Sequence, residues 1–185
     1  MAFGYQVLGF GSGVSAGEAT APEVAWLGAR GVFCGGKGPG GVINVIEYIT
    51  IASAGNATDF GDVVTARSGA GACSNGSRLV YGGGGNTSTY SFNQIEYLTI
   101  GSLGNMSDFG DLTDSRRQVA AAASNATIGM WLGGHDGYAA AKNTVDKVNI
   151  ASTGNATDFG DLSMAKGNGS ATSNGTRAVY AGGDG

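Results

Sequence analysis

Hydrophobic and polar positions alternate along short runs of this chain, as they do in β-strands. The run Ile46-Glu47-Tyr48-Ile49-Thr50-Ile51 returns at residues 95–100 and, more loosely, at 145–150. Successive side chains of a strand lie on opposite faces. One face of the run holds two isoleucines beside the glutamate, and the other holds an isoleucine and a tyrosine beside the threonine. Both faces are substantially apolar, so we expect strands in a sheet covered on both sides.

Two further patterns accompany this run. A short apolar run with one aromatic, stopped by paired glycines, occurs at residues 30–36, 78–84, 128–134 and, with Tyr180, at 177–183. Paired glycines permit positive φ and therefore end strands well. Segments of very small side chains precede the last three of these runs, at residues 71–75, 122–125 and 171–174. They suit an inner strand crowded near a central axis.

The clearest repeat is Gly-Asn-x-(Thr/Ser)-Asp-Phe-Gly-Asp, which begins at Gly55, Gly104 and Gly154, 49 and 50 residues apart. Gly-Asn supplies a turn, and the following residues read as a loop plus a short outer strand with one large aromatic. Four short strands in each unit of about 50 residues is the arithmetic of a β-propeller blade.

The order Asp-Leu-Thr-x-x-Arg, small-residue strand, aromatic-Gly-Gly and Asn-x-(Ile/Val)-(Glu/Asp) resembles the kelch repeat, with phenylalanine at the family's usual tryptophan. The resemblance covers residues 21–185 and is clearest over 43–185. It implies an all-β fold of kelch-like β-propeller blades, each of four antiparallel strands, with about 3.5 units in the chain. We expect units at about 21–64, 65–113 and 114–163 and a partial unit at 164–185, preceded by a Gly-rich amino-terminal docking arm at 1–20.

Counting the strands leaves the ring incomplete. The glycine-stopped strand occurs four times, but the strands that follow it occur three times each. Propellers have at least four blades, so we expect another chain or a longer product to complete the ring. An open stack of units is the alternative.

Composition narrows the functional classes. The chain has 36 glycines, yet 42% of its residues are hydrophobic and 13% charged, which favours order over disorder. A net charge of −4 with scattered basic residues argues against a nucleic-acid partner. No stretch approaches the roughly 18–20 apolar residues of a membrane span, and the amino terminus does not resemble a signal peptide. Cys34 and Cys73 fit no metal spacing, and buried thiols are favoured over a disulfide.

The repeated aspartates raise the question of calcium. Each Asp-Phe-Gly-Asp carries two carboxylates near an asparagine, but the spacing fits no EF-hand loop. A turn cap, or an ion pair to the base five residues later (Arg67, Arg116 or Lys166), is favoured. Calcium binding stays open. The chain also has eight Asn-x-Ser/Thr triplets, which we interpret as turns.

Candidate ligand-binding residues lie in two glycine-rich loops: Lys37 in one, and His135, Asp136 and Tyr138 in the other. A surface loop position is favoured for His135, with a ligand contact as the alternative. A single histidine excludes the copper-radical chemistry of galactose oxidase, and no catalytic motif is recognisable. We therefore expect a non-enzymatic protein without cofactor, metal or catalytic residue.

The first thirteen residues and the Gly-Asn-Ala-Thr-Asp-Phe-Gly-Asp repeats resemble structural proteins of marine and cyanobacterial tailed phages. The resemblance implies a virion component such as a tail fibre, appendage or decoration, made in the host cytoplasm. Its expected partners are further copies of itself, other virion proteins and a host surface glycan or protein reached by the blade loops. The alternatives are a soluble kelch-like protein-interaction module and a carbohydrate-active enzyme with acidic residues gathered from different blades.

Overall fold

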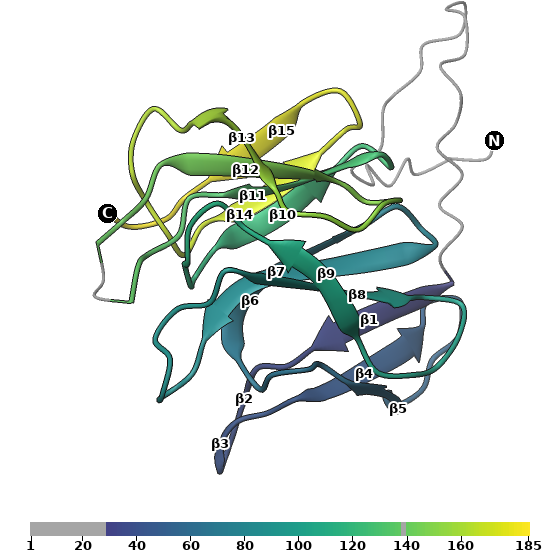
Figure 1. The fold of residues 1–185 in the computed structure, drawn as a ribbon. Helices are drawn as coiled ribbons and strands as arrows, with labels where there is room; N and C mark the ends of the chain where they lie inside the picture. The colour runs from purple at the N-terminus through teal and green to yellow at the C-terminus, as the bar shows by residue number, and fades with distance from the viewer. Residues whose placement is uncertain (1–28, 138–139) are drawn as a thin grey trace, which may run out of the picture.

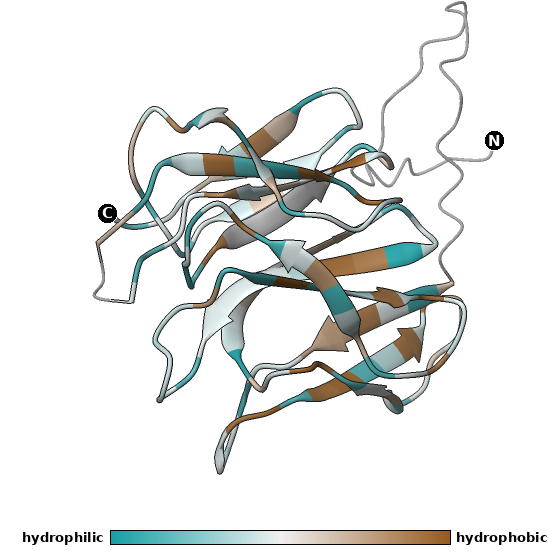
Figure 2. Cartoon of the chain, in the orientation of Figure 1, coloured by the Kyte–Doolittle hydropathy of each residue, from teal (hydrophilic) through white to brown (hydrophobic). Residues whose placement is uncertain are grey.

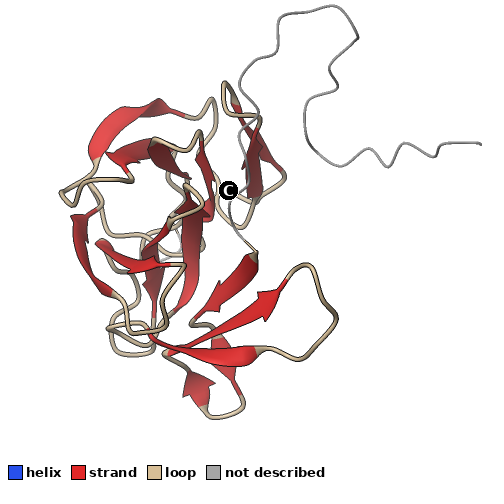
Figure 3. Ribbon diagram, turned by 90° about the vertical axis from the view of Figure 1, so that its right-hand side faces the viewer, coloured by secondary structure: helices blue, strands red, loops and turns tan. Residues whose placement is uncertain are grey.

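The structure is a computed structural model that describes residues 29–137 and 140–185. All regular secondary structure in this part of the chain is β-strand (Figures 1 and 3). The all-β prediction is therefore confirmed. The predicted docking arm at residues 1–20 lies outside the described residues.

The strands form antiparallel sheets that follow the chain. The first sheet has the order β1 (Arg30–Cys34), β4 (Val45–Thr50), β5 (Thr58–Asp62). The second sheet has the order β6 (Ser68–Ser74), β7 (Arg78–Gly85), β8 (Gln94–Thr99), β9 (Ser107–Asp111). The third sheet has the order β10 (Ala120–Ser124), β11 (Ile128–Leu132), β12 (Thr144–Asn149), β13 (Thr157–Asp161). The fourth sheet is the pair β14 (Ser170–Ser173), β15 (Ala178–Ala181), and a small hairpin joins β2 (Lys37–Gly38) to β3 (Gly41–Val42).

The second and third sheets each contain the four strands predicted for one unit, in chain order. The described part of the first sheet has the last three of them, and the fourth sheet has the first two. Turn residues explain the tight hairpins between the first two strands of a unit. The Asn75 side chain accepts hydrogen bonds from the backbone N–H groups of Ser77 and Arg78, and Asn125 and Asn174 do the same in their units. These asparagines are turn formers, as predicted.

The repeated Asp-Phe-Gly segment is a β-bulge. In the second sheet Ile95 lies opposite Gly110, but the next residue, Glu96, lies opposite Asp108. Phe109 is therefore the extra residue, without an opposite partner on β8. The first and third sheets have the same shift at the same place. A bulge bends its strand and redirects a side chain, and here Phe109 turns inward and is only 2% exposed.

Three hydrophobic clusters lie between successive sheets. Val80, Ile95 and Phe109 of the second sheet pack with residues of the third, including Trp131 and Ile150. The opposite face of the second sheet (Leu79, Tyr81, Leu98, Ile100) packs against Ile46, Phe60 and Val63 of the first sheet and the segment after it. A third cluster joins Leu132 and Val145 to Tyr180. Apolar side chains on both faces of β7 and β8 are thus covered by the neighbouring sheets, as predicted.

The sheets follow one another through the molecule from the purple to the yellow end of Figure 1. The inner strand β10 lies beside β6 on one side and β14 on the other. Hydrophobic residues gather on the strands, and the turns are mainly pale or teal (Figure 2). The part of the chain that the structure describes has no helix that could cross a membrane.

The second and third Gly-Asn turns each fasten their unit to the preceding sheet. Gly104 and Met106 donate backbone hydrogen bonds to the carbonyls of Phe60 (2.9 Å) and Asp62 (2.8 Å). The Asn105 side chain accepts a further bond from the Asp62 N–H at 3.0 Å. One unit later, the turn at Asn155 makes the same three bonds to β9. The repeat found in the sequence is therefore a device that joins units.

Candidate functional site

His135 lies where the third sheet ends and its long loop begins. Strand β11 ends at Leu132, and His135 exchanges backbone hydrogen bonds with Arg117, at 2.8 and 2.9 Å. Its side chain is only 6% exposed, so the surface position favoured from the sequence is wrong. The cause is Gly167, which lies against the imidazole: a Cβ on Gly167 would stand 2.1 Å from His135 Nδ1. Only a glycine at this position lets the backbone approach so closely.

The imidazole of His135 faces a carboxylate on one side. Its Nε2 lies 4.0 Å from the exposed carboxylate of Asp184, which also accepts a hydrogen bond from Asn168. Its Nδ1 is buried without a hydrogen-bond partner among the described residues. Gly167 occupies the space in front of that atom, so Nδ1 faces backbone and not an open pocket. This arrangement anchors the loop against the backbone of the next unit.

Tyr90 is the exposed aromatic of this region, and the sequence analysis did not single it out. It is 54% exposed, and the Arg117 guanidinium lies 6.0 Å from its ring centroid. Gly137 of the next unit lies against it, since a Cβ there would be 2.8 Å from Tyr90 Cβ. Loops from two units therefore meet at this tyrosine. We call Tyr90, Arg117 and Asp184, which surround the buried His135, the loop surface.

The other predicted ligand residues fall in different places. Asp136 is half-buried and closes its own loop, because its carboxylate accepts the Ala140 N–H at 3.0 Å. Tyr138 lies outside the described residues. Lys37 is exposed on β2 of the first unit, directly after a glycine pair, as His135 is in the third unit. The structure therefore places Lys37 and His135 at equivalent positions of non-adjacent units and does not bring them together.

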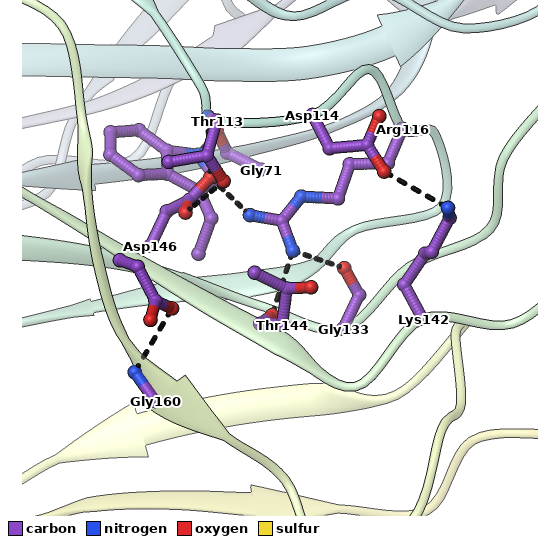
Figure 4. A network of polar contacts seen from close by, with 11 residues as sticks. Gly71, Thr113, Asp114, Arg116, Gly133, Lys142, Thr144, Asp146 and Gly160 are labelled. Atoms are coloured by element: carbon purple, nitrogen blue, oxygen red, sulfur yellow. Dashed lines mark hydrogen bonds and ion pairs between the residues drawn. The ribbon is translucent and has the colours of Figure 1, made fainter.

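The strongest electrostatic feature is a buried network around Arg116, in the segment that joins the second and third sheets (Figure 4). Arg116 and Asp146 are both fully buried and form an ion pair. Arg116 also donates to the carbonyls of Thr144 (2.7 Å) and Gly133 (3.3 Å). Thr113 donates its hydroxyl and its N–H to the same carboxylate, at 2.6 and 3.1 Å. Desolvation lowers the pKa of Arg116, and the charge of Asp146 opposes that shift.

The same network recurs one unit earlier. Arg67 is fully buried and donates to the carboxylate of Glu96 at 2.6 Å, and the Val64 N–H donates to the other oxygen of that carboxylate at 2.9 Å. The guanidinium also stands 4.8 Å from the Tyr81 ring centroid. The expected ion pairs between these arginines and the aspartates of the preceding Asp-Phe-Gly-Asp are therefore wrong. Their partners lie on β8 and β12 of the following sheet.

Backbone contacts show what these arginines do for the fold. The Arg116 carbonyl accepts a hydrogen bond from Gly84 of the second sheet at 2.9 Å, while its side chain binds Asp146 of the third. The Arg67 carbonyl likewise accepts from Gly36 beside the first sheet. Each arginine thus ties two successive sheets together. Removal of one partner from a buried pair is strongly destabilising.

Metal-binding chemistry has no cluster to support it in the described residues. Within residues 29–137 and 140–185, no three histidine, cysteine, aspartate or glutamate side chains converge on one point. Both thiols are free, with Cys73 buried and Cys34 half-buried. Burial raises the pKa of each to about 12, which keeps both protonated and unreactive at neutral pH.

No protein-family model matches this chain, and no curated protein matches it in sequence.

Proposed function

We propose that this chain is a non-enzymatic structural and adhesion component of a tailed-phage particle, built from kelch-like β-propeller blades. The sequence resemblance is the basis for the assignment to a phage particle, and the order of strands in the sheets supports the blade architecture. Two complete four-stranded antiparallel sheets follow one another, flanked by sheets that contain part of the same strand set. The small-residue strands β6, β10 and β14 lie side by side, as the inner strands of adjacent blades do.

The observation that carries the structural role is the use made of the buried charges. The two fully buried ion pairs, Arg67–Glu96 and Arg116–Asp146, lie at corresponding places and join successive sheets. An enzyme places perturbed ionisable groups around a cleft where they meet substrate. Here these groups meet backbone carbonyls and one another. They support a rigid array of units.

The adhesion role rests on the loop surface. An exposed aromatic ring beside a cation offers an apolar face together with polar groups, the combination that binds sugars and polar peptides. Tyr90 supplies the ring and Arg117 the cation, and the exposed Asp184 carboxylate lies beside His135, whose backbone pairs with Arg117. These side chains come from loops of three units. We infer that this surface faces a host glycan or protein.

The first test is binding of the purified protein to intact cyanobacterial cells. We expect Tyr90→Ala to reduce the bound fraction at least about tenfold, the loss typical of an aromatic hot spot. Phe33→Ala is the matched control, because Phe33 is an equally exposed aromatic (57%) on β1. Equal binding by the wild type and Tyr90→Ala would refute the adhesion surface.

A second test separates a virion protein from a soluble interaction module. Deletion of residues 1–20 should abolish incorporation into phage particles, measured by mass spectrometry of purified virions. The circular dichroism of the truncated protein should keep its β signature. Normal incorporation of the truncated chain would argue against the docking arm.

A further inference from the structure

The third sheet has an open face where the first and second sheets are covered. Phe60 and Phe109 are each 2% exposed, whereas Phe159, at the same place on β13, is 59% exposed. A Cβ on Gly61 or Gly110 would meet the turn of the next unit at 2.4 or 2.5 Å. A Cβ on Gly160 would meet nothing within 4 Å. Strand β13 therefore presents a complete turn-binding edge without a turn among the described residues.

Near β13, Lys166 occupies the position that Arg67 and Arg116 occupy in the preceding units. Its carbonyl accepts the Gly134 N–H at 3.0 Å, as the Arg116 carbonyl accepts from Gly84. Its ammonium lies 4.9 Å from the Tyr180 ring centroid, as Arg67 lies 4.8 Å from Tyr81. Arg67 and Arg116 each have a carboxylate from the third strand of the following unit. Lys166 has no ion pair within the described residues.

The fourth sheet has only two strands of the four that a complete unit contains. Strands β14 and β15 correspond to the first two strands of the second sheet, β6 and β7. The counterparts of β8 and β9 would pair with β15, bring a carboxylate to Lys166 and bring a Gly-Asn turn to β13. The missing occupant is therefore a hairpin with an acidic residue on its first strand and Gly-Asn before its second.

The chain contains such a hairpin at the opposite end of the molecule (Figure 1). Strands β4 and β5 carry Glu47, which is exposed, in the place of the buried Glu96 and Asp146. Ile51 is 66% exposed, although its equivalents Ile100 and Ile150 are buried. The turn residues 55–57 are exposed as well. Residues 1–28 contain no lysine or arginine that could pair with Glu47.

We propose that the β4–β5 hairpin of one copy completes the fourth sheet of a second copy. Strand β15 replaces β1 at the edge of β4, giving the order β14-β15-β4-β5. Strand β15 is equivalent to β1 in sequence, because both have an arginine followed three residues later by an aromatic residue. The known pairing of Arg30 with Thr50 becomes a pairing of Arg177 with Thr50.

The exchanged arrangement repeats the ion pair and the turn contact of the internal junctions. Glu47 of one copy pairs with Lys166 of the other, as Glu96 pairs with Arg67. Asn56 accepts from the Asp161 N–H, as Asn105 accepts from Asp62. Two copies joined twice in this way contain six four-stranded units, a number within the range of closed propellers. The inference rests on the blade arrangement of the proposed function, and it adds the partner and its interface.

The test starts from the mass of the purified full chain by light scattering. We expect a closed dimer at twice 18.3 kDa. Glu47→Lys or Lys166→Glu should weaken the dimer at least about tenfold, because each places like charges together in the interface. The double variant should restore it, since both junctions regain opposite charges. Lys37→Glu is the control and should leave the dimer intact, because Lys37 lies on the exposed β2.

A monomeric wild type at about 100 µM would overturn the proposal, because interface affinities of stable dimers lie well below that concentration. A dimer unaffected by both charge reversals would overturn it too, and would leave the adhesion test on Tyr90 untouched. Loss of cell binding with an intact dimer would instead bear on the proposed function alone.

A disulfide test reads out the strand exchange itself. Thr50→Cys mixed with Arg177→Cys should give a covalent dimer on a non-reducing gel, because these positions become direct cross-strand neighbours. Either variant alone should stay non-covalent, because only the mixture places two engineered thiols at one cross-strand pair; both variants also carry Cys34→Ser, since Cys34 lies on the displaced β1. A mixture that yields only single chains after oxidation would refute the exchange.

Discussion

The bulge glycines provide the sharpest test of how the units are joined. Gly110 has a φ of +146°, and a Cβ there would lie 2.5 Å from the carbonyl oxygen of Gly154 and 2.9 Å from the backbone nitrogen of Asn155. Both neighbours are backbone and cannot rotate away. In the variant Gly110→Ala the turn at Gly154 must therefore leave β9.

The magnitude follows from the contacts that the turn makes. Its departure breaks the bonds from Gly154 to Phe109 (2.8 Å), from Ala156 to Asp111 (2.7 Å) and from Asp111 to Asn155 (3.0 Å). Each is worth about 1 kcal/mol, so about 3 kcal/mol is lost. Backbone strain at a positive φ adds about 1–3 kcal/mol.

Gly160→Ala is the matched control for that strain. Gly160 occupies the corresponding position in the bulge of β13, with a φ of +139°, but a Cβ there would meet nothing within 4 Å. Both variants are made with Lys166→Glu, so that a second copy does not cover Gly160. Urea unfolding followed by circular dichroism should show Gly110→Ala about 3 kcal/mol less stable than Gly160→Ala. Equal free energies of unfolding for the two variants would refute the argument that the turn fastens the units.

Further predictions concern the core and the buried charges. Arg116→Met should cost about 3–5 kcal/mol in denaturant unfolding because it strands the Asp146 carboxylate, and adding Asp146→Leu should recover more than half of that loss; no recovery would argue against a stranded charge. Phe109→Ala should cost about 3–5 kcal/mol, whereas Phe159→Ala should cost under about 1 kcal/mol in the monomeric background; equal costs would contradict the exposures. Because burial raises the pKa of the Cys73 thiol to about 12, folding favours its protonated form, so stability should be intact below about pH 9 and fall as the pH rises toward 12. Cys73→Ala should flatten that fall in unfolding curves measured across this range, and an unchanged slope would exclude the thiol as its cause.

Local sequence patterns predicted most of the strands and turns. Period-two alternation at residues 46–51 and 95–100 predicted strands covered on both faces, and the strands β4 and β8 occupy those runs. The glycine pairs marked the ends of β1, β11 and β15 correctly, but β7 continues through Gly82 to Gly85, where the prediction is wrong. The asparagines marked the turns. These features depend on a residue and its near neighbours, so they can be read from the order of residues alone.

The pairing of charges was decided by the tertiary structure. From sequence, Asp62 stands five residues before Arg67 and seemed its natural partner. In the fold, Arg67 pairs with Glu96, 29 residues away. Glu96 lies on β8 of the following sheet and is buried with Arg67, and the exclusion of water around both groups makes this pairing decisive. Such a choice depends on which groups are buried together.

The site shows the same division. The sequence located the loop of His135 but misjudged its burial, because Gly167, 32 residues later, lies against the ring. It also passed over Tyr90, which the packing of two loops leaves exposed beside Arg117. The sequence by itself determined the strands, the turns and the period of the units. Only the tertiary structure decided which residues are buried, which charges pair and which strand edges, those of β13 and β15, stay open. These properties depend on contacts between residues far apart in the chain, because the energies of charges and apolar groups depend on how much water is excluded around them.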